Sequence, residues 1–182
     1  MRKRICLSVL AVLLVLMLSA TFTGMIITGF EDALAAQVAL TAFIPMLMGT
    51  GGNSGSQSSV TVIRALSLDE LKFADLPKVL WKEIRTSVLC GIALSIACFA
   101  KIWLVDRMLM GNEEITLLVD AVVCLALLVT VVAAKIVGAV LPMVAKVVKL
   151  DPAVMASPFI TTIVDALSLL VYFVFAKMLL KV

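Results

Sequence analysis

The chain has 182 residues, of which 63% are hydrophobic, and its mean hydropathy is +1.21. A soluble domain contains about 45–50% apolar residues, so this composition is typical of an integral membrane protein. The net charge of +3 includes no basic patch suited to nucleic acid, and the absence of histidine excludes metal sites and proton relays built on imidazole.

The apolar segments predict an all-α membrane protein with five transmembrane helices. A helix needs about 20 predominantly apolar residues to cross the hydrocarbon core. The predicted helices cover about residues 5–27, 34–66, 84–105, 117–141 and 154–180. They leave no room for a soluble domain, so residues 1–182 are expected to form a single transmembrane domain. The first apolar run is longer than a signal-peptide core of about 7–15 residues, which favours a retained helix.

Charged residues between these segments predict the orientation. One side of the membrane would carry Arg2, Lys3, Arg4, Arg64, Lys72, Lys78, Lys82, Arg85, Lys146 and Lys149. The other side would carry Glu31, Asp32, Asp106, Arg107, Glu113 and Glu114. By the positive-inside rule, the N-terminus is cytoplasmic and the C-terminus lies outside a plasma membrane after five crossings.

In the second predicted helix, a polar or small residue recurs at every fourth position. The series is Gln37, Thr41, Pro45, Gly49, Asn53, Gln57 and Thr61. Residues with this spacing share one slowly rotating face of a helix. Polar groups at membrane depth persist only where they face protein or water. The stripe therefore indicates a pathway and not a lipid-facing surface.

The third and fourth predicted helices carry seams of small residues. The seams are Ser87, Gly91 and Ser95 in the third helix, and Ala126, Thr130, Ala134 and Gly138 in the fourth. Small residues let neighbouring helices approach closely, so we interpret both seams as packing faces.

A second polar stripe lies on the fifth predicted helix. It consists of Pro158, Thr161, Asp165, Ser168 and Tyr172. Asp165 lies about 20 Å along a helix from Asp151, close to the bilayer midplane. An ionised carboxylate at this depth costs at least about 2.5–3.5 kcal/mol, so it needs a partner or water. A protonated aspartate bonded between helices is one interpretation, and a cation site in a wet passage is the one we favour.

The donors on the two stripes are carboxylate, amide, hydroxyl and carbonyl oxygens. Such hard ligands suit Mg²⁺, Ca²⁺ or Mn²⁺, whereas zinc and copper favour thiolate and imidazole. Mg²⁺ retains much of its water and is usually bound through one or two carboxylates. One aspartate per chain therefore suffices if two chains share an axis. Ligand type alone does not separate these divalent ions or exclude a potassium or sodium path.

Several motifs along the chain occur in a specific order. They are Pro45, the run Gly49-Thr50-Gly51-Gly52-Asn53-Ser54-Gly55-Ser56-Gln57, Arg64, Asp151-Pro152-Ala153, Pro158, Thr161-Thr162 and Asp165. In this order they resemble the membrane domain of the MgtE-type magnesium channels and transporters, over essentially the whole chain.

The resemblance implies a homodimer with a pore on its two-fold axis, lined by the second and fifth helices. It implies that a pair of Asp165 carboxylates holds hydrated Mg²⁺, the transported ion, at the midplane, and that Asn53 and Gly49 lie beside the ion path. The stripes add Pro45, Gln57, Thr161 and Ser168 to the pore lining. Ser168 departs from the family pattern, in which glycine is often expected, and its added hydroxyl would narrow the path or supply another ligand.

The longer members of the family carry a cytoplasmic acidic sensing domain and a pair of CBS domains. We expect neither in this chain, which is either a naturally short member or a truncated one. As a hypothesis, its pore closes less at high internal magnesium than that of a full-length relative; currents that shut normally would contradict this.

Three kinds of function remain open on the residues alone. The first is conduction of magnesium through a channel-like pore, with the lipid bilayer, divalent cations and a second copy as partners. The second is a coupled secondary carrier of another cation or small solute, and the third is a non-transporting membrane scaffold. An enzyme is not expected, because no nucleophile–base pair or metal-bound-water arrangement is found. Flux into liposomes separates the three, since only the carrier requires a co-ion gradient and only the scaffold gives no flux.

Overall fold

The computed structural model of the chain describes residues 2–112, 114–149 and 158–181, and this part is helical with no strand. The elements are α1 (Arg2–Gly29), α2 (Glu31–Ala36), η1 (Val38–Phe43), α3 (Ile44–Ser67), η2 (Phe73–Asp75), α4 (Leu76–Lys101), η3 (Ile102–Leu109), α5 (Leu117–Val147) and α6 (Pro158–Leu180). The prediction of an all-α protein is confirmed.

Among the described residues, four helical stretches are long and apolar enough to cross a membrane. They are Val12–Gly29, Phe73–Leu109, Leu117–Val147 and Phe159–Leu180. The 24 residues of α3 would span about 36 Å, which is long enough, but its glycine-rich polar run keeps this helix out of the apolar set. The structure therefore supports four spans by length and composition, and a fifth crossing by α3 stays a prediction.

The second predicted helix, residues 34–66, is divided in the structure. Its first ten residues belong to α2, to the 3₁₀-helix η1 and to the junctions between them, and the long helix begins only at Ile44. Pro45 lies in the first turn of α3. Proline is well accepted there because the first amides of a helix have no intrahelical partner. Hydropathy alone did not reveal this start.

The other predicted boundaries differ by less. α4 begins at Leu76, eight residues earlier than predicted, with proline in its first turn, and it continues into the π-helix η3. α5 begins at residue 117 as predicted, where the Thr116 side chain accepts a hydrogen bond from the Val119 amide, and it continues beyond Pro142 to Val147. The predicted start of the last helix at residue 154 lies outside the described residues.

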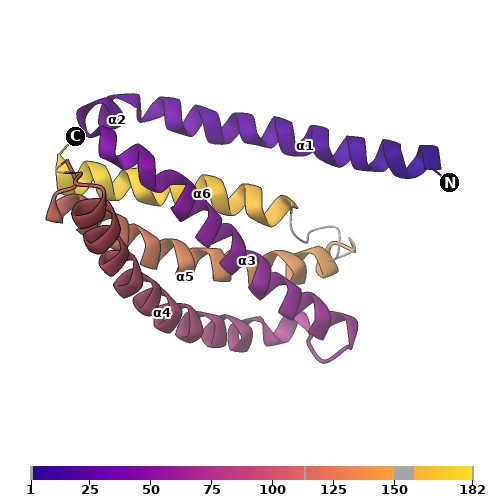
Figure 1. The fold of residues 1–182 in the computed structure, drawn as a ribbon. Helices are drawn as coiled ribbons and strands as arrows, with labels where there is room; N and C mark the ends of the chain where they lie inside the picture. The colour runs from indigo at the N-terminus through magenta and orange to yellow at the C-terminus, as the bar shows by residue number, and fades with distance from the viewer. Residues whose placement is uncertain (1, 113, 150–157, 182) are drawn as a thin grey trace.

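α5 is the central helix of the bundle. It packs against α3, α4 and α6, while α1 lies along α6 (Figure 1). The predicted small-residue seams lie at these contacts: a Cβ added at Gly91 of α4 would be 3.3 Å from the Leu128 carbonyl oxygen of α5. The Ser95 hydroxyl of α4 donates to the Cys124 carbonyl of α5 at 2.8 Å. Small residues thus let α4 approach the α5 backbone.

The backbones of α3 and α5 approach each other closely at Gly55 and Gly138. A Cβ added at Gly138 would meet the Gly55 carbonyl group and would lie 3.0 Å from the Gly55 Cα. The ends of the two helices are joined as well, because Lys146 Nζ donates to the Leu66 carbonyl at 2.9 Å. The two helices therefore run in the same direction, and the basic residues of their last turns, Arg64 and Lys146, lie at one end of the bundle.

Candidate ion-binding site

The glycine-rich run of α3 is regular helix with two unlike faces. The stripe predicted from its spacing is exposed in a single chain at Thr41, Pro45, Gly49, Asn53, Gln57 and Thr61, and half-buried at Gln37. The opposite face is buried and consists of Gly51, Gly52, Ser54, Gly55, Ser58, Ser59 and Val62. The helix is therefore held against the bundle by one face and presents polar residues on the other.

Asp165 and Thr161 of α6 lie against Gly52 of α3. A Cβ added at Gly52 would be 3.6 Å from Asp165 Oδ1 and 3.5 Å from Thr161 Cγ2. Gly52 directly precedes Asn53, a member of the exposed stripe. The structure thus brings the predicted aspartate of α6 beside the predicted polar helix, although the two are more than 100 residues apart in the chain.

The carboxylate of Asp165 is half-buried. No hydrogen bond or ion pair joins it to another residue within the described ranges, and a carboxylate in apolar surroundings is stable only when water, a cation or a proton accompanies it. No group of three or more histidine, cysteine, aspartate or glutamate side chains within these ranges could hold a metal ion. A single chain therefore offers one carboxylate and not a complete coordination sphere.

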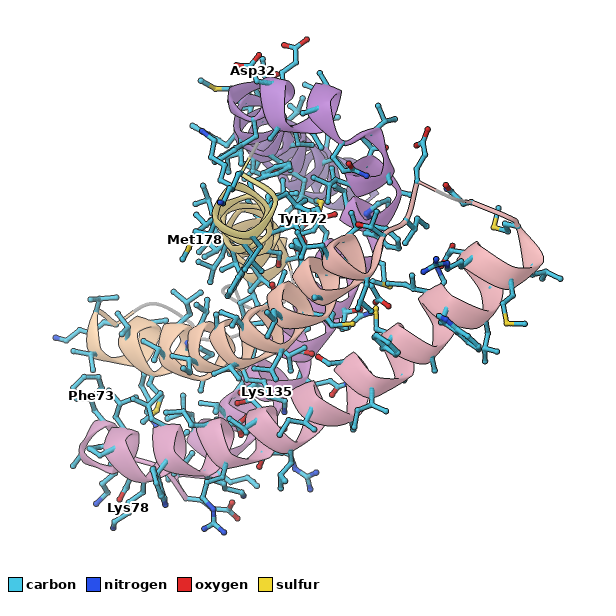
Figure 2. All side chains as sticks on the ribbon, turned by 90° about the vertical axis from the view of Figure 1, so that its left-hand side faces the viewer. Asp32, Phe73, Lys78, Lys135, Tyr172 and Met178 are labelled. Carbon is cyan, nitrogen blue, oxygen red and sulfur yellow. The ribbon has the colours of Figure 1, made fainter. Side chains whose placement is uncertain are left out.

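Two members of the α6 stripe have packing roles in this chain. Ser168 is fully buried, its hydroxyl donates to the Val164 carbonyl at 2.6 Å, and it lies against Gly51. The Tyr172 hydroxyl donates to the Leu40 carbonyl at 2.9 Å, inside the bundle (Figure 2). The place of Ser168 in a pore lining stays a prediction. The spacing of the stripe did not reveal these packing contacts, because they depend on neighbouring helices.

Two other charged groups within apolar helices have partners away from this site. Lys135 of α5 points to α4, where its Nζ lies 3.5 Å from Glu83 Oε2 (Figure 2). Asp120 of α5 is buried and accepts a hydrogen bond from the Cys124 thiol at 3.4 Å. Asp165 thus differs from both, because it alone among these three has no partner in the described chain.

The remaining sequence motif, Asp151-Pro152-Ala153, lies outside the described residues. The partner of Lys135, Glu83, was not predicted from the sequence. The only signal was that Glu83 is the single acidic residue of α4 and that Lys135 lies in the middle of α5.

A sequence model of the MgtE family, described as divalent cation transporter, matches residues 44–175 of the chain. The match begins at the start of α3 and ends within α6, so it includes both helices that form the candidate site.

Three curated proteins are similar to the chain, and each is named magnesium transporter MgtE. That of Bacillus subtilis (strain 168) is 38% identical over 163 residues, which is 88% of this chain and 34% of the relative. That of Thermus thermophilus is 35% identical over 169 residues, or 93% of this chain and 36% of the relative. The Enterococcus faecalis protein is 28% identical over 169 residues, with the same coverage. The chain spans about a third of the length of these curated relatives.

Proposed function

We propose, because the chain belongs to the MgtE family of divalent cation transporters, that it carries Mg²⁺ across a plasma membrane. In the proposed topology the chain crosses the membrane five times, because α3 is a crossing in addition to the four apolar spans. The N-terminus is cytoplasmic and the C-terminus is external. Arg64 and Lys146 lie in the last turns of α3 and α5, which the Lys146–Leu66 hydrogen bond joins at one end of the bundle, and these basic residues support the cytoplasmic assignment of that end.

The pore would form between two copies of the chain on a two-fold axis. The observation that supports this is the exposed polar face of α3 at Gly49, Asn53 and Gln57, which the bundle of one chain leaves uncovered. Amide groups exposed to lipid tails are unfavourable, whereas the same groups facing a second copy across water can be satisfied. Polar residues on an otherwise lipid-embedded helix thus favour a water-lined dimer axis.

The ion site would combine Asp165 from each copy, and the position of this carboxylate is the single observation on which the proposed mechanism depends. It lies beside Gly52, next to Asn53, and has no partner within the described residues. Two carboxylates match the +2 charge of Mg²⁺. Because Mg²⁺ gives up its water reluctantly, the carboxylates would hold the ion through retained water molecules.

A pore of this kind needs no coupling ion. The membrane potential supplies about 2.3 kcal/mol per charge per 100 mV, hence about 4.6 kcal/mol for a divalent ion. Magnesium would therefore enter passively. The pair of Asp165 carboxylates need only offset the free-energy cost of placing the ion at the middle of the membrane.

The test is Mg²⁺ uptake into proteoliposomes under an imposed potassium diffusion potential, with no gradient of a coupling ion. Asp165→Asn should reduce the uptake at least about tenfold, because it removes both carboxylates from the pore. Asp120→Asn is the matched control, since it changes a carboxylate in another apolar helix that already has a partner. Equal uptake by the Asp165→Asn variant and the unaltered chain would refute the site, and a requirement for a second ion gradient would indicate a coupled carrier.

The dimer axis has a test of its own. In a background with the native cysteines replaced, Asn53→Cys should form a disulfide between two copies on mild oxidation in membranes. Leu89→Cys, on the lipid-exposed surface of α4 with 71% of its surface accessible, should not. Cross-linking at Leu89→Cys but not at Asn53→Cys would place the contact between copies on a different face.

A further inference from the structure

A cavity lies between η3 and the start of α5, at the end of the bundle where α6 ends (Figure 1). Its volume is about 160 Å³, and it is lined among others by Phe99, Trp103, Arg107, Thr116, Leu117 and Asp120. Most of its lining side chains are apolar, so the interior does not suit a soluble polar molecule. A drug-sized ligand needs about 300–1,000 Å³, so the cavity has room for only part of a larger apolar molecule.

The surface beside the cavity is apolar as well. Leu109 and Met110 are 80% and 71% exposed, and Trp103 in the cavity wall is 48% exposed. An apolar surface of this kind marks a contact with membrane or protein. The apolar stretch Phe73–Leu109 ends here, and tryptophan is enriched at the level of the lipid headgroups. The cavity therefore lies where one end of the bundle would meet the headgroup region.

Arg107 is the cationic group of the cavity lining. It is exposed, and no ion pair joins its guanidinium to another residue in the part of the chain that the structure describes. The adjacent Asp106 is already bound, because Lys101 Nζ donates to its two carboxylate oxygens at 2.7 and 3.1 Å. Across the cavity α5 begins at Leu117, and the N-terminus of a helix carries a partial positive charge. This rim of the cavity therefore attracts an anion.

The deeper wall carries an acid that is turned away from the rim. Asp120 is 4% exposed, and its Oδ1 accepts a hydrogen bond from the Cys124 thiol at 3.4 Å. Phe99, two helical turns before Arg107, forms another part of this wall. The cavity thus has a cationic rim near the end of the apolar stretch and a largely apolar interior further in. A phospholipid has the same order of groups, with a phosphate at the surface and hydrocarbon below it.

We infer that the cavity binds an anionic phospholipid of the phosphatidylglycerol class, with part of one acyl chain between η3 and α5 and the phosphate on Arg107. A guanidinium group binds phosphate oxygens through two parallel hydrogen bonds, which favours arginine at such a site. Phosphatidylcholine has the same phosphate, but its quaternary ammonium would lie close to Arg107 and oppose binding. The lipid would hold η3 against α5. This site is built on α4, η3 and α5, so it is separate from the candidate ion site on α3 and α6.

The test uses Trp103 as a fluorescent reporter, because its side chain lines the cavity. The chain has two tryptophans, so Trp81→Phe leaves Trp103 as the only one. The full chain is reconstituted into phosphatidylcholine vesicles that contain a minor fraction of phosphatidylglycerol. Brominated acyl chains, which quench tryptophan on contact, are placed on one lipid or the other. Per lipid molecule, brominated phosphatidylglycerol should bind at Trp103 about fivefold more strongly, as for one exposed ion pair, and Arg107→Gln should abolish this preference.

Two controls separate the site from a general attraction of anionic lipid. Arg85→Gln removes an exposed arginine at the other end of α4 and should leave the preference at Trp103 unchanged. In the complementary chain with Trp103→Phe, Arg107→Gln should not alter the quenching of Trp81.

Equal binding of the two lipids at Trp103, or a preference that survives Arg107→Gln, would overturn the inference. Absence of quenching by either lipid would show that a second copy or another part of a longer protein covers the cavity, and would overturn it too. Inorganic phosphate at a matched concentration should not displace the lipid; displacement would mean that the site binds phosphate without an acyl chain. None of these measurements depends on magnesium flux, so the lipid site can fail while the proposed transport stands, and the reverse also holds.

Discussion

Gly138 lies at the close contact between α3 and α5. Even the addition of a single methyl group at this position should lower the free energy of unfolding markedly. In the variant Gly138→Ala, the new Cβ would meet the Gly55 carbonyl group, with the Gly55 carbonyl carbon at 2.9 Å. Carbon atoms in ordinary contact are about 3.5–4.0 Å apart. Because the obstacle is backbone and not a flexible side chain, α3 and α5 must move apart by about 0.5–1 Å.

The magnitude follows from two opposing terms. Forcing extra volume into a packed contact costs about 1–3 kcal/mol, and a gap of this size also forfeits about a quarter to a half of each dispersion contact along the seam. Alanine is the better helix former by about 1 kcal/mol, which offsets part of this loss. We expect a net decrease of about 2 kcal/mol in the free energy of unfolding.

The assay is unfolding of the purified chain from mild detergent into SDS, followed by circular dichroism. Gly24→Ala in α1 is the matched control, because nothing lies within 4 Å of the position where its Cβ would be. That variant should be neutral or more stable by up to about 1 kcal/mol. A Gly138→Ala variant as stable as the unaltered chain, beside a control that behaves as expected, would refute the close approach of α3 and α5.

Three further predictions use the same measurement of unfolding free energy. Gly51→Ala should destabilise the chain, because its Cβ would lie 2.6 Å from Ser168 Oγ, and Ser168→Ala in the same chain should recover part of the loss; purely additive effects would contradict this contact. Tyr172→Phe should cost about 0.5–1.5 kcal/mol, because it removes the buried hydrogen bond to the Leu40 carbonyl of η1, and an unchanged stability would contradict a stabilising role of this bond. Lys135→Met should cost about 3–5 kcal/mol by leaving Glu83 buried without its cation, whereas Lys135→Met with Glu83→Gln should cost less; an equal loss in both would show that the pair is not coupled.

The polar face of α3 could be predicted from the sequence because it depends on local geometry alone. Residues four apart share a face of any α-helix, so Gly49, Asn53 and Gln57 had to point the same way once that segment was helical. The sequence could not show which glycine meets which neighbour. Gly52 faces Asp165 and Gly55 faces Gly138 because of the way three helices pack, and no spacing within one helix encodes that.

Helix boundaries and charge pairs were predicted less well for the same reason. Hydropathy marks where a chain is apolar, so it did not reveal that α3 begins next to Pro45. Lys135 pairs with Glu83 because α4 and α5 are antiparallel with a particular register, which the small-residue seams allow but do not determine. The occupation of Asp165 depends on a second copy of the chain, so it stays a prediction.

The unbroken α-helix through Gly49–Gln57 bears on how an ion could be discriminated. Channels that strip an ion bare replace its shell with rows of free main-chain oxygens, but the carbonyls of a continuous helix already accept amides one turn further along. This part of α3 therefore has no free carbonyls that could replace the water molecules around Mg²⁺. A pore lined by α3 would select ions by the size of the hydrated ion. Hydrated divalent ions are larger and hold their water more tightly than hydrated monovalent ions. The pore would then distinguish the two by the fit of the hydrated ion between the helices and by its charge, and hardly by the number of protein ligands.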